Sequence, residues 1–311
     1  MNHNTIGRSF EFAFLLELSE AIEKFRKIKI IKNNPFCFAQ KEWFTLPKFQ
    51  QIAYRQSLRK TIDLILELEP NLKNNLDDIL NIYINEDKKG EEGDSRDVIL
   101  KFENTKWEIG FNLKKNNVSF KHSRLSNKID FGQRWYGINC SENYWNDIRP
   151  IFANLEKEQE KQVEWKSLQN KQETIYLPLL SAFSKEFLTR YYGNKSIIKN
   201  LIEYIVGKRD FYQIISFDSD HNTKIKCFNL HNELSQNNQY SRIKLSKFPT
   251  KILSFKFKQN SLDTIELKMN NNWHINFRIH NVSRIVEPSL KFDIKLINTP
   301  NSVKIFNQKW N

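Results

Sequence analysis

Residues 93–125 read GDSRDVILKFENTKWEIGFNLKKNNVSFKHSRL. Two short apolar runs within this stretch, 97–102 and 107–113, are separated by a polar gap centred on Asn104 and Thr105. Asn and Thr in a short gap between β-prone runs are typical of a β-hairpin. We therefore expect two antiparallel strands here.

The pairing of these strands brings polar side chains together at the open end of the hairpin. With this turn, Lys101 faces Glu108, and Asp97 lies opposite Asn112. Because strand side chains alternate, Lys114 projects from the same face as Asn112. An Asp, a polar oxygen opposite it and a nearby Lys outline a metal-dependent nuclease site.

Phosphodiester hydrolysis explains why these residue types matter. It requires an activated water and relief of negative charge, which Mg²⁺ held by carboxylate oxygens can supply. A Lys beside the metal can position the water or stabilise the charge. Asp97, Asn112 and Lys114 are therefore candidate catalytic residues, with Asp97 as a metal ligand. The alternative is a surface hairpin with solvated charges, because Asp…Asn-x-Lys alone is a weak pattern.

A second carboxylate is expected because Asn112 carries no negative charge. Glu11 is one candidate for a catalytic and metal-binding role. It belongs to an expected helix at 8–28 and lies on the apolar stripe of Leu15, Leu18 and Ile22. A carboxylate buried there needs a cation, a metal or a hydrogen-bond donor. Alternatively, an acid near a helix N-terminus is favoured by the helix dipole alone.

Glu108 is the other candidate for the same catalytic and metal-binding role. It shares a strand face with Asn112, but four residues span roughly 13 Å along a strand. In the expected register Glu108 is too far from Asp97 to share one ion. A different register or a bulge would bring it closer, so both acids remain candidates.

The charge of the chain favours a polyanionic partner. Among its 311 residues, the formal net charge is +13 and the pI is about 9.4. Nucleic acid is the simplest partner for such a surface. An AT-rich coding sequence, which yields abundant Lys and Asn, is the alternative explanation.

Cysteine usage and hydropathy indicate the compartment. The three cysteines are widely spaced and form no CxxC pair, which favours a reduced cytoplasmic interior. No apolar run reaches the length of a membrane span, and the N-terminal residues lack a signal-peptide pattern. We therefore expect a cytoplasmic protein with no membrane partner.

The rest of the chain predicts helices first and strands later, an α/β (α+β) organisation. Residues 85–95 form an expected polar loop. Six segments between 208 and 297 alternate apolar and polar residues as half-buried strands do. A polar helical stretch suggests a boundary, dividing the chain into a core at 1–165 and a connector with a β-rich region at 166–311. Helices are expected at 8–28, 45–69, 71–84, 141–172, 176–192 and 195–206.

Candidate DNA-binding residues concentrate in two stretches. Arg is suited to guanine O6 and N7 in the major groove, and Lys to phosphates. Residues near 281–288 in the later stretch can equally form a loop between two strands, and His122 in the earlier stretch can be an ordinary structural histidine. The first group is Lys115, Lys121, His122, Arg124 and Arg134, and the second is Arg278, His280, Asn281, Arg284 and Lys291.

Several long segments together resemble the HaeIII-type family of type II restriction endonucleases. They are GRSFEF, GDSRDVIL, WEIGFNLKKNN, KHSRLSNKIDFGQRWYG and FRIHNVSRIVEPSLKFDIKL. The resemblance implies a PD-(D/E)xK nuclease core, in which helices flank a mixed sheet, with a β-rich C-terminal DNA-binding region. It also implies Mg²⁺-dependent cleavage of double-stranded DNA at GGCC between G and C, and a companion DNA methyltransferase.

Carried over by position, Asp97 and Lys114 match the family's motif, and Glu108 belongs to its EIG stretch. The chain departs from the family where Ser-x-Lys is usual, because it reads Asn112-Leu113-Lys114. This departure leaves the set of metal ligands open. A palindromic site suggests a homodimer, although a monomer acting twice is the alternative.

Two other functions compete with the restriction enzyme. One is a structure-specific or repair nuclease on the same core. The other is a basic DNA-binding protein without catalysis. Defined fragments from a plasmid digest would favour the restriction enzyme over the repair nuclease. DNA binding without cleavage in any divalent metal would favour the DNA-binding protein.

Overall fold

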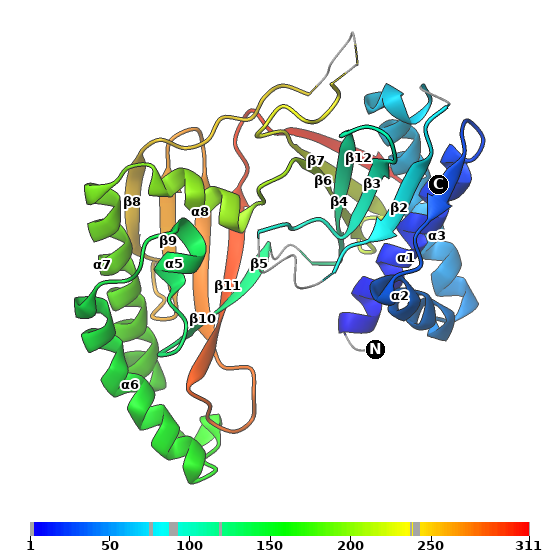
Figure 1. Ribbon diagram of the computed structural model, residues 1–311. Coiled ribbons are helices and arrows are strands. Elements are labelled where there is room, and N and C mark those ends of the chain that lie inside the picture. The colour runs from blue at the N-terminus through cyan, green and yellow to red at the C-terminus, as the bar shows by residue number, and fades with distance from the viewer. Residues whose placement is uncertain are drawn as a thin grey trace. The chain divides into compact units, whose positions relative to one another are not determined.

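The computed structural model describes residues 3–74, 77–86, 93–117, 120–236, 238 and 243–310. The chain forms two compact units, each built from separate segments (Figure 1). Unit 1 comprises Met1–Val118, Gly207–Lys247 and Ser302–Asn311, and unit 2 comprises Ser119–Val206 and Phe248–Asn301.

These units do not follow the expected boundary at residue 165. Strand β4 (Glu108–Lys115) pairs in parallel with β6 (Phe211–Phe217), and parallel neighbours require a crossover connection. The first segment of unit 2 lies within this crossover. The late strands of unit 1 therefore complete a sheet that begins near the N-terminus.

Unit 1 is built on a seven-stranded mixed sheet, as expected for the fold. The strand order is β1-β2-β3-β4-β6-β7-β12, with parallel pairing at β1-β2 and β4-β6. The remaining strands are β1 (Ile28–Ile30), β2 (Leu80–Ile84), β3 (Val98–Phe102), β7 (Asn222–Phe228) and β12 (Lys304–Lys309).

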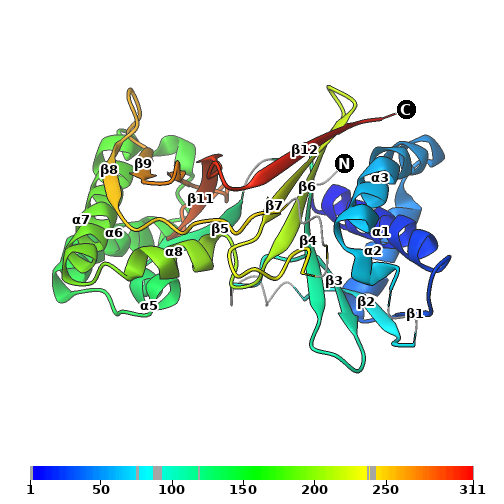
Figure 2. The same ribbon diagram turned by 90° about the horizontal axis from the view of Figure 1, so that it is seen from above.

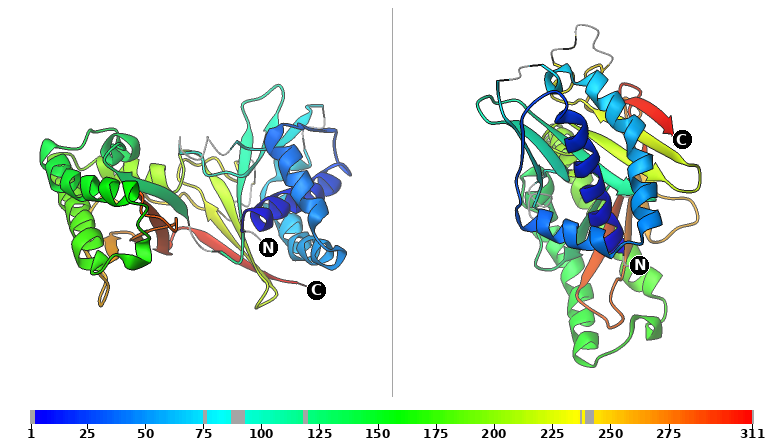
Figure 3. Two further views of the ribbon diagram at one scale, coloured as in Figure 1. Left: turned by 90° about the horizontal axis from the view of Figure 1, so that it is seen from below. Right: turned by 90° about the vertical axis from the view of Figure 1, so that its right-hand side faces the viewer.

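Three helices cover one face of this sheet: α1 (His3–Ile22), α2 (Asn34–Thr45) and α3 (Lys48–Leu68) (Figures 2 and 3). The side chain of Asn33 caps α2 by accepting from Phe36 N. Phe14 of α1 packs on Phe111 of β4, with ring centroids 4.8 Å apart. This contact fixes the first helix against the strand that carries the expected site.

The helix predicted over 71–84 was wrong. A 3₁₀ turn spans Pro70–Leu72, and Leu80–Ile84 forms β2, between β1 and β3. Residues 75 and 76 of the predicted helix lie outside the described residues, as do 87–92 of the expected loop. The LNIYI segment buries alternate side chains, so its period is that of a strand.

The first helix ends six residues earlier than expected, at Ile22. Beyond it, Arg26 donates to the carbonyl oxygens of Asn71 and Asn74, both at 3.0 Å, and its guanidinium lies 4.3 Å from the ring centre of Phe102. These contacts hold the chain at the sheet edge, where Ile28–Ile30 can form β1.

The predicted register of the hairpin is confirmed. Lys101 pairs with Glu108 and Val98 pairs with Phe111. The paired residues end at Val98, and just beyond them the side chains of Asp97 and Asn112 meet, with Asn112 Nδ2 3.3 Å from Asp97 Oδ2.

Gly110, in the middle of β4, accommodates the side chain of Arg96. A Cβ at Gly110 would lie 2.0 Å from Cδ of Arg96, which is held by Asp94 and Glu108 at 2.7 and 2.8 Å. We expect Gly110→Ala to lower the free energy of unfolding by about 1–3 kcal/mol, because Arg96 must move. Urea titration measures this change.

Gly7→Ala is the matched control for the Gly110 substitution. No atom lies within 4 Å of a Cβ at Gly7, which is inside α1. Alanine there should stabilise the helix by about 0.5–1 kcal/mol. Equal effects of the two substitutions would contradict the proposed role of Gly110.

Unit 2 is built on a five-stranded antiparallel sheet in the order β5-β11-β10-β9-β8. One face is a dense aromatic core, in which Trp135 stacks on Phe277 and Phe292. The strands are β5 (Lys121–Ser126), β8 (Ile252–Phe257), β9 (Thr264–Met269), β10 (His274–His280) and β11 (Ser289–Asn298); the helices are α5 (Phe131–Tyr136), α6 (Glu142–Glu160), α7 (Leu177–Gly193) and α8 (Ile197–Ile205).

The helices predicted at 141–172, 176–192 and 195–206 are present as α6, α7 and α8, although α6 ends at Glu160. All six segments predicted to form strands between 208 and 297 are strands. In the described part of the chain, no helix is long and apolar enough to cross a membrane.

Candidate active site

Asp97 lies directly before β3 and is held through its main chain on both sides. Its N–H donates to the carbonyl oxygen of Phe111 at 2.7 Å, and its carbonyl oxygen accepts from Asn85 N at 2.8 Å. These bonds tie Asp97 to β4 on one side and to the end of β2 on the other. The side chain therefore starts from a rigid backbone.

The carboxylate of Asp97 is oriented through one oxygen. Oδ2 accepts from Leu113 N at 2.6 Å and from Asn112 Nδ2 at 3.3 Å, and lies 3.6 Å from Lys114 Nζ. The side chains of Asp97 and Lys114 are 23% and 22% exposed, so solvent and ligands reach both. All three of these contacts use Oδ2 rather than Oδ1.

Glu11 is buried on α1, as its position on the apolar stripe predicts. The pKa of Glu11 is raised to about 8, chiefly by burial and then by the charge of Asp97, while Arg8 and Lys114 partly oppose the rise. Arg8 Nη1 donates to Glu11 Oε2 at 2.8 Å. Asp97, Glu11 and Lys114 therefore share one electrostatic site although they come from three elements.

Glu108 has a different environment. Its Oε1 lies 2.8 Å from Arg96 Nη1 and 3.3 Å from Arg209 Nη2. Two guanidinium groups thus neutralise this carboxylate away from the hairpin end that carries Asp97. The geometry favours Glu11, not Glu108, as the acid that joins Asp97.

The donor set suits Mg²⁺. Within the residues that the structure describes, no three His, Cys, Asp or Glu side chains gather closely enough to hold a metal alone. Mg²⁺ is usually held by one or two carboxylates, retains several waters and binds substrate phosphates. Burial raises the pKa of Glu11 most and the charge of Asp97 adds to the rise, and a divalent cation would offset this repulsion between the two acids.

Lys115 is not placed for the expected contact with DNA. Only 1% of its side chain is exposed, and its ammonium contacts Ser216 Oγ at 3.1 Å and the carboxylate of Asp218. It also lies 4.8 Å from the ring centres of both Tyr54 and Trp310. Burial lowers the pKa of Lys115, while Asp218 opposes this shift. Lys115 alternates with Lys114 along β4 and so belongs to the core-facing side.

Five of the expected DNA-binding residues share one face of the sheet in unit 2. Arg124 pairs with Lys291, which pairs with His280, and Asp293 pairs with both His122 and Arg278. Paired residues lie on the same face of a sheet. We call this the open face; it is opposite the aromatic core and contains His122, Arg124, Arg278, His280 and Lys291.

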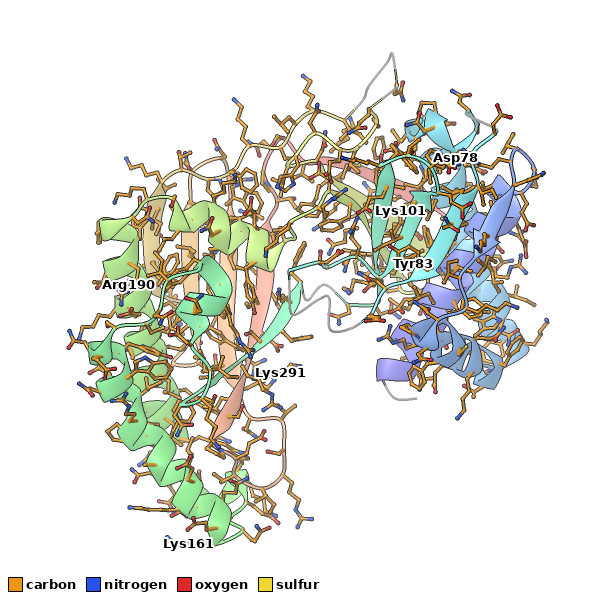
Figure 4. All side chains as sticks on the ribbon, in the orientation of Figure 1. Asp78, Tyr83, Lys101, Lys161, Arg190 and Lys291 are labelled. Atoms are coloured by element: carbon orange, nitrogen blue, oxygen red, sulfur yellow. The ribbon has the colours of Figure 1, made fainter. Side chains whose placement is uncertain are left out.

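Asp293 lies at the centre of the open face. Its carboxylate accepts from His122 Nδ1 and lies 3.5 Å from Lys291 Nζ and 3.6 Å from His280 Nδ1. Arg278 is paired instead with Asp263 at 3.2 Å. Figure 4 shows Lys291 on β11, away from Lys161 at the end of α6. The open face therefore combines several cationic donors with one central acceptor.

Comparison with known proteins agrees with this geometry. The model of the HaeIII restriction endonuclease family matches residues 7–300. The type II restriction enzyme HaeIII of Haemophilus aegyptius is 41% identical over 312 residues, covering 99% of this chain and 98% of that enzyme. The chain belongs to the HaeIII restriction endonuclease family. It is accordingly a type II restriction enzyme, a site-specific deoxyribonuclease, and the family resemblance of its sequence segments is confirmed.

Four other expected DNA-binding residues of this HaeIII-family chain lie outside the open face. Lys121 faces the helices, where its ammonium donates to the carbonyl oxygen of Tyr204 at 2.6 Å. Arg134 is exposed on α5. In the loop after β10, Asn281 Oδ1 accepts from Tyr176 Oη at 2.9 Å, and Arg284 Nε donates to Glu164 at 2.8 Å.

Three functional candidates of the HaeIII-family chain were missed by sequence reasoning. Arg8 is three residues before Glu11, a helical spacing that could have revealed the pair. Asp293 is two residues after Lys291 on β11, so strand alternation places both on one face and could have revealed Asp293. Gln213, which donates to Asn112 Oδ1 at 3.2 Å, is distant in the sequence and gives no local signal.

Proposed function

We propose that this HaeIII-family enzyme hydrolyses double-stranded DNA at GGCC, between G and C, in a reaction that requires Mg²⁺. The grouping of Asp97, Glu11 and Lys114 at one end of the hairpin carries the catalytic part of the proposal. The sequence specificity is inferred from the family and from the name of the relative from Haemophilus aegyptius.

In this proposal Asp97 Oδ1 and the carboxylate of Glu11 hold Mg²⁺. When bound, the metal supplies a Lewis acid and lowers the pKa of a coordinated water. Lys114 places a positive charge beside Asp97, where it would stabilise negative charge on the scissile phosphate. Arg8 orients Glu11 through the bond to Oε2 and opposes part of the rise in its pKa that burial causes.

Glu11→Gln and Glu108→Gln should separate the two candidate acids. We expect Glu11→Gln to lower kcat about a hundredfold or more, because a charge at the metal site is lost. Glu108→Gln should instead lower the free energy of unfolding by about 1–3 kcal/mol, because Arg96 and Arg209 lose a charged partner. Single-turnover cleavage and urea unfolding measure the two effects. If Glu108→Gln lost activity and Glu11→Gln did not, Glu108 would be the metal ligand.

Unit 2 would read or hold the DNA through its open face, while unit 1 carries the catalytic residues. We expect Arg124→Ala and Lys291→Ala each to weaken binding to a GGCC duplex. If each residue contacts one phosphate, each substitution should also reduce by about 1 the salt slope, which is the slope of log K for binding against the logarithm of the salt concentration. Fluorescence anisotropy in Ca²⁺ at several salt concentrations measures this slope. Lys161→Ala, at the end of α6, is the matched control and should leave the slope unchanged.

The partners follow from the proposed reaction. A two-fold palindrome favours a homodimer that presents one active site to each strand. A companion methyltransferase acting on the same sequence would protect the host DNA, and a cytoplasmic location would give both enzymes access to it.

Digestion of a plasmid with mapped cut ends tests the proposal most directly. Blunt ends within GGCC in Mg²⁺, and intact DNA in EDTA, are the expected results. Cuts that depend on DNA structure rather than sequence would instead indicate a repair nuclease. Binding without cleavage in any divalent metal would indicate a DNA-binding protein only.

A further inference from the structure

We infer that Asn112 orients Asp97 as a hydrogen-bond donor, with its amide fixed by Gln213, and is not a metal ligand. The inference rests on the proposed function and gives a role to the residue at which this chain departs from the family's motif. Gln213, on β6, and Asn112, on β4, are thereby positioning residues that act through Asp97.

Three contacts define the orientation of the Asn112 amide. Nδ2 donates to the carbonyl oxygen of Ser95 at 2.6 Å and to Asp97 Oδ2 at 3.3 Å. The reversed amide would place its oxygen against both of these acceptors, with no proton between them. Because such contacts are repulsive, the Ser95 carbonyl and the Asp97 carboxylate fix the amide with its nitrogen toward β3.

Gln213 fixes the other end of the amide. Strand β4 lies between β3 and β6, and Asn112 pairs with Gln213 across the parallel ladder. Gln213 Nε2 donates to Asn112 Oδ1 at 3.2 Å, and both side chains are buried. The amide oxygen is thus directed toward β6, whereas Asp97 lies on the β3 side.

This arrangement supplies an amide donor at the position where Ser-x-Lys is usual in the family. The donor from Asn112 and the N–H of Leu113 both engage Oδ2 of Asp97, which holds the carboxylate in one rotamer. The same Asn112 nitrogen holds the backbone at Ser95, two residues before Asp97. The network Gln213–Asn112–Asp97 therefore sets the direction of Oδ1.

Asn112→Asp distinguishes a donor from a ligand. If Asn112 were a ligand, the added charge would strengthen metal binding. As a donor, the Asp substitution removes the hydrogen bond and brings acceptors against Ser95 and Asp97. We expect Mn²⁺ affinity without DNA, measured by electron paramagnetic resonance, to fall about 10–100-fold, as is usual when a residue supporting a ligand is lost.

Gln213→Leu is a second test that leaves every carboxylate in place. Loss of its donor frees the Asn112 amide, so Mn²⁺ affinity and kcat should fall together while KM for DNA stays unchanged. Ser216→Ala, on the same strand, removes a buried hydrogen bond to Lys115 and is the matched control. Its Mn²⁺ affinity should equal that of the wild type.

The outcomes separate this inference from the proposed function. Unchanged or tighter Mn²⁺ binding by Asn112→Asp, or wild-type binding by Gln213→Leu, overturns the inference. Wild-type Mn²⁺ binding by Asp97→Ala instead overturns the proposed metal site. Circular dichroism establishes folding, and Gln213→Leu decides the question if Asn112→Asp does not fold.

Discussion

Asp97→Ala should reduce cleavage of GGCC-containing DNA by at least about a thousandfold, the upper range for loss of one group that stabilises developing charge. Asp97 is the only carboxylate that β3 and β4 contribute beside Lys114 within the described hairpin, and its Oδ1 is the proposed ligand atom. DNA affinity should persist, because removal of a negative charge does not weaken contact with phosphates. Cleavage under single-turnover conditions and anisotropy in Ca²⁺ measure the two quantities separately.

Asp97→Asn is the control for structural damage in this experiment. Alanine leaves Leu113 N without this acceptor, a loss worth about 1–3 kcal/mol of stability, while Asn112 Nδ2 keeps its bond to the Ser95 carbonyl. Asparagine retains an acceptor but no charge. Both variants should therefore be inactive, although only Asp97→Ala should be clearly less stable. An active Asp97→Asn enzyme would show that the charge is dispensable and would refute the assignment.

Lys114→Ala should lower kcat about a hundredfold or more and leave KM for DNA nearly unchanged. The ammonium of Lys114 lies beside Asp97, and in the proposed role it stabilises charge that develops during the reaction, rather than the bound ground state. Lys114→Arg should recover little, because a planar guanidinium does not replace a compact ammonium. Single-turnover rates at saturating enzyme measure the effect.

Lys101→Ala is the matched control for Lys114. Lys101 is an exposed lysine on the other strand of the same hairpin, paired with Glu108 (Figure 4). Its removal changes the net charge equally but is distant from Asp97. A comparable loss of activity in both variants would reduce the role of Lys114 to general electrostatics.

The hairpin could be predicted from the sequence because its information is local. The turn residues and the alternation of side chains set the register, and Lys101 pairs with Glu108 as expected. The burial of Glu11 followed from the helical period in the same way. By contrast, LNIYI at 80–84 was assigned to a helix because a short apolar run fits either period.

The orientation and burial of the side chains near Asp97 depend on residues that are far away in the sequence. The direction of the Asn112 amide depends on Gln213, which reaches β4 only through the parallel pairing with β6. Lys115 is the same residue type as Lys114 and follows it directly, yet its burial depends on Tyr54, Asp218 and Trp310. Neither outcome has a signal within the hairpin itself, so the expected phosphate contact of Lys115 could not be excluded from sequence.

The parallel pairing of β4 with β6 also sets an order of events during synthesis. About a hundred residues separate these strands, and the ribosome needs roughly 5–20 s to add them. Until then β4 emerges with one edge unpaired, and the Asn112 amide has no Gln213 to hold it. The nascent hairpin therefore stays unpaired along this edge until β6 is made, and the proposed active site can be completed only after most of the chain has left the ribosome.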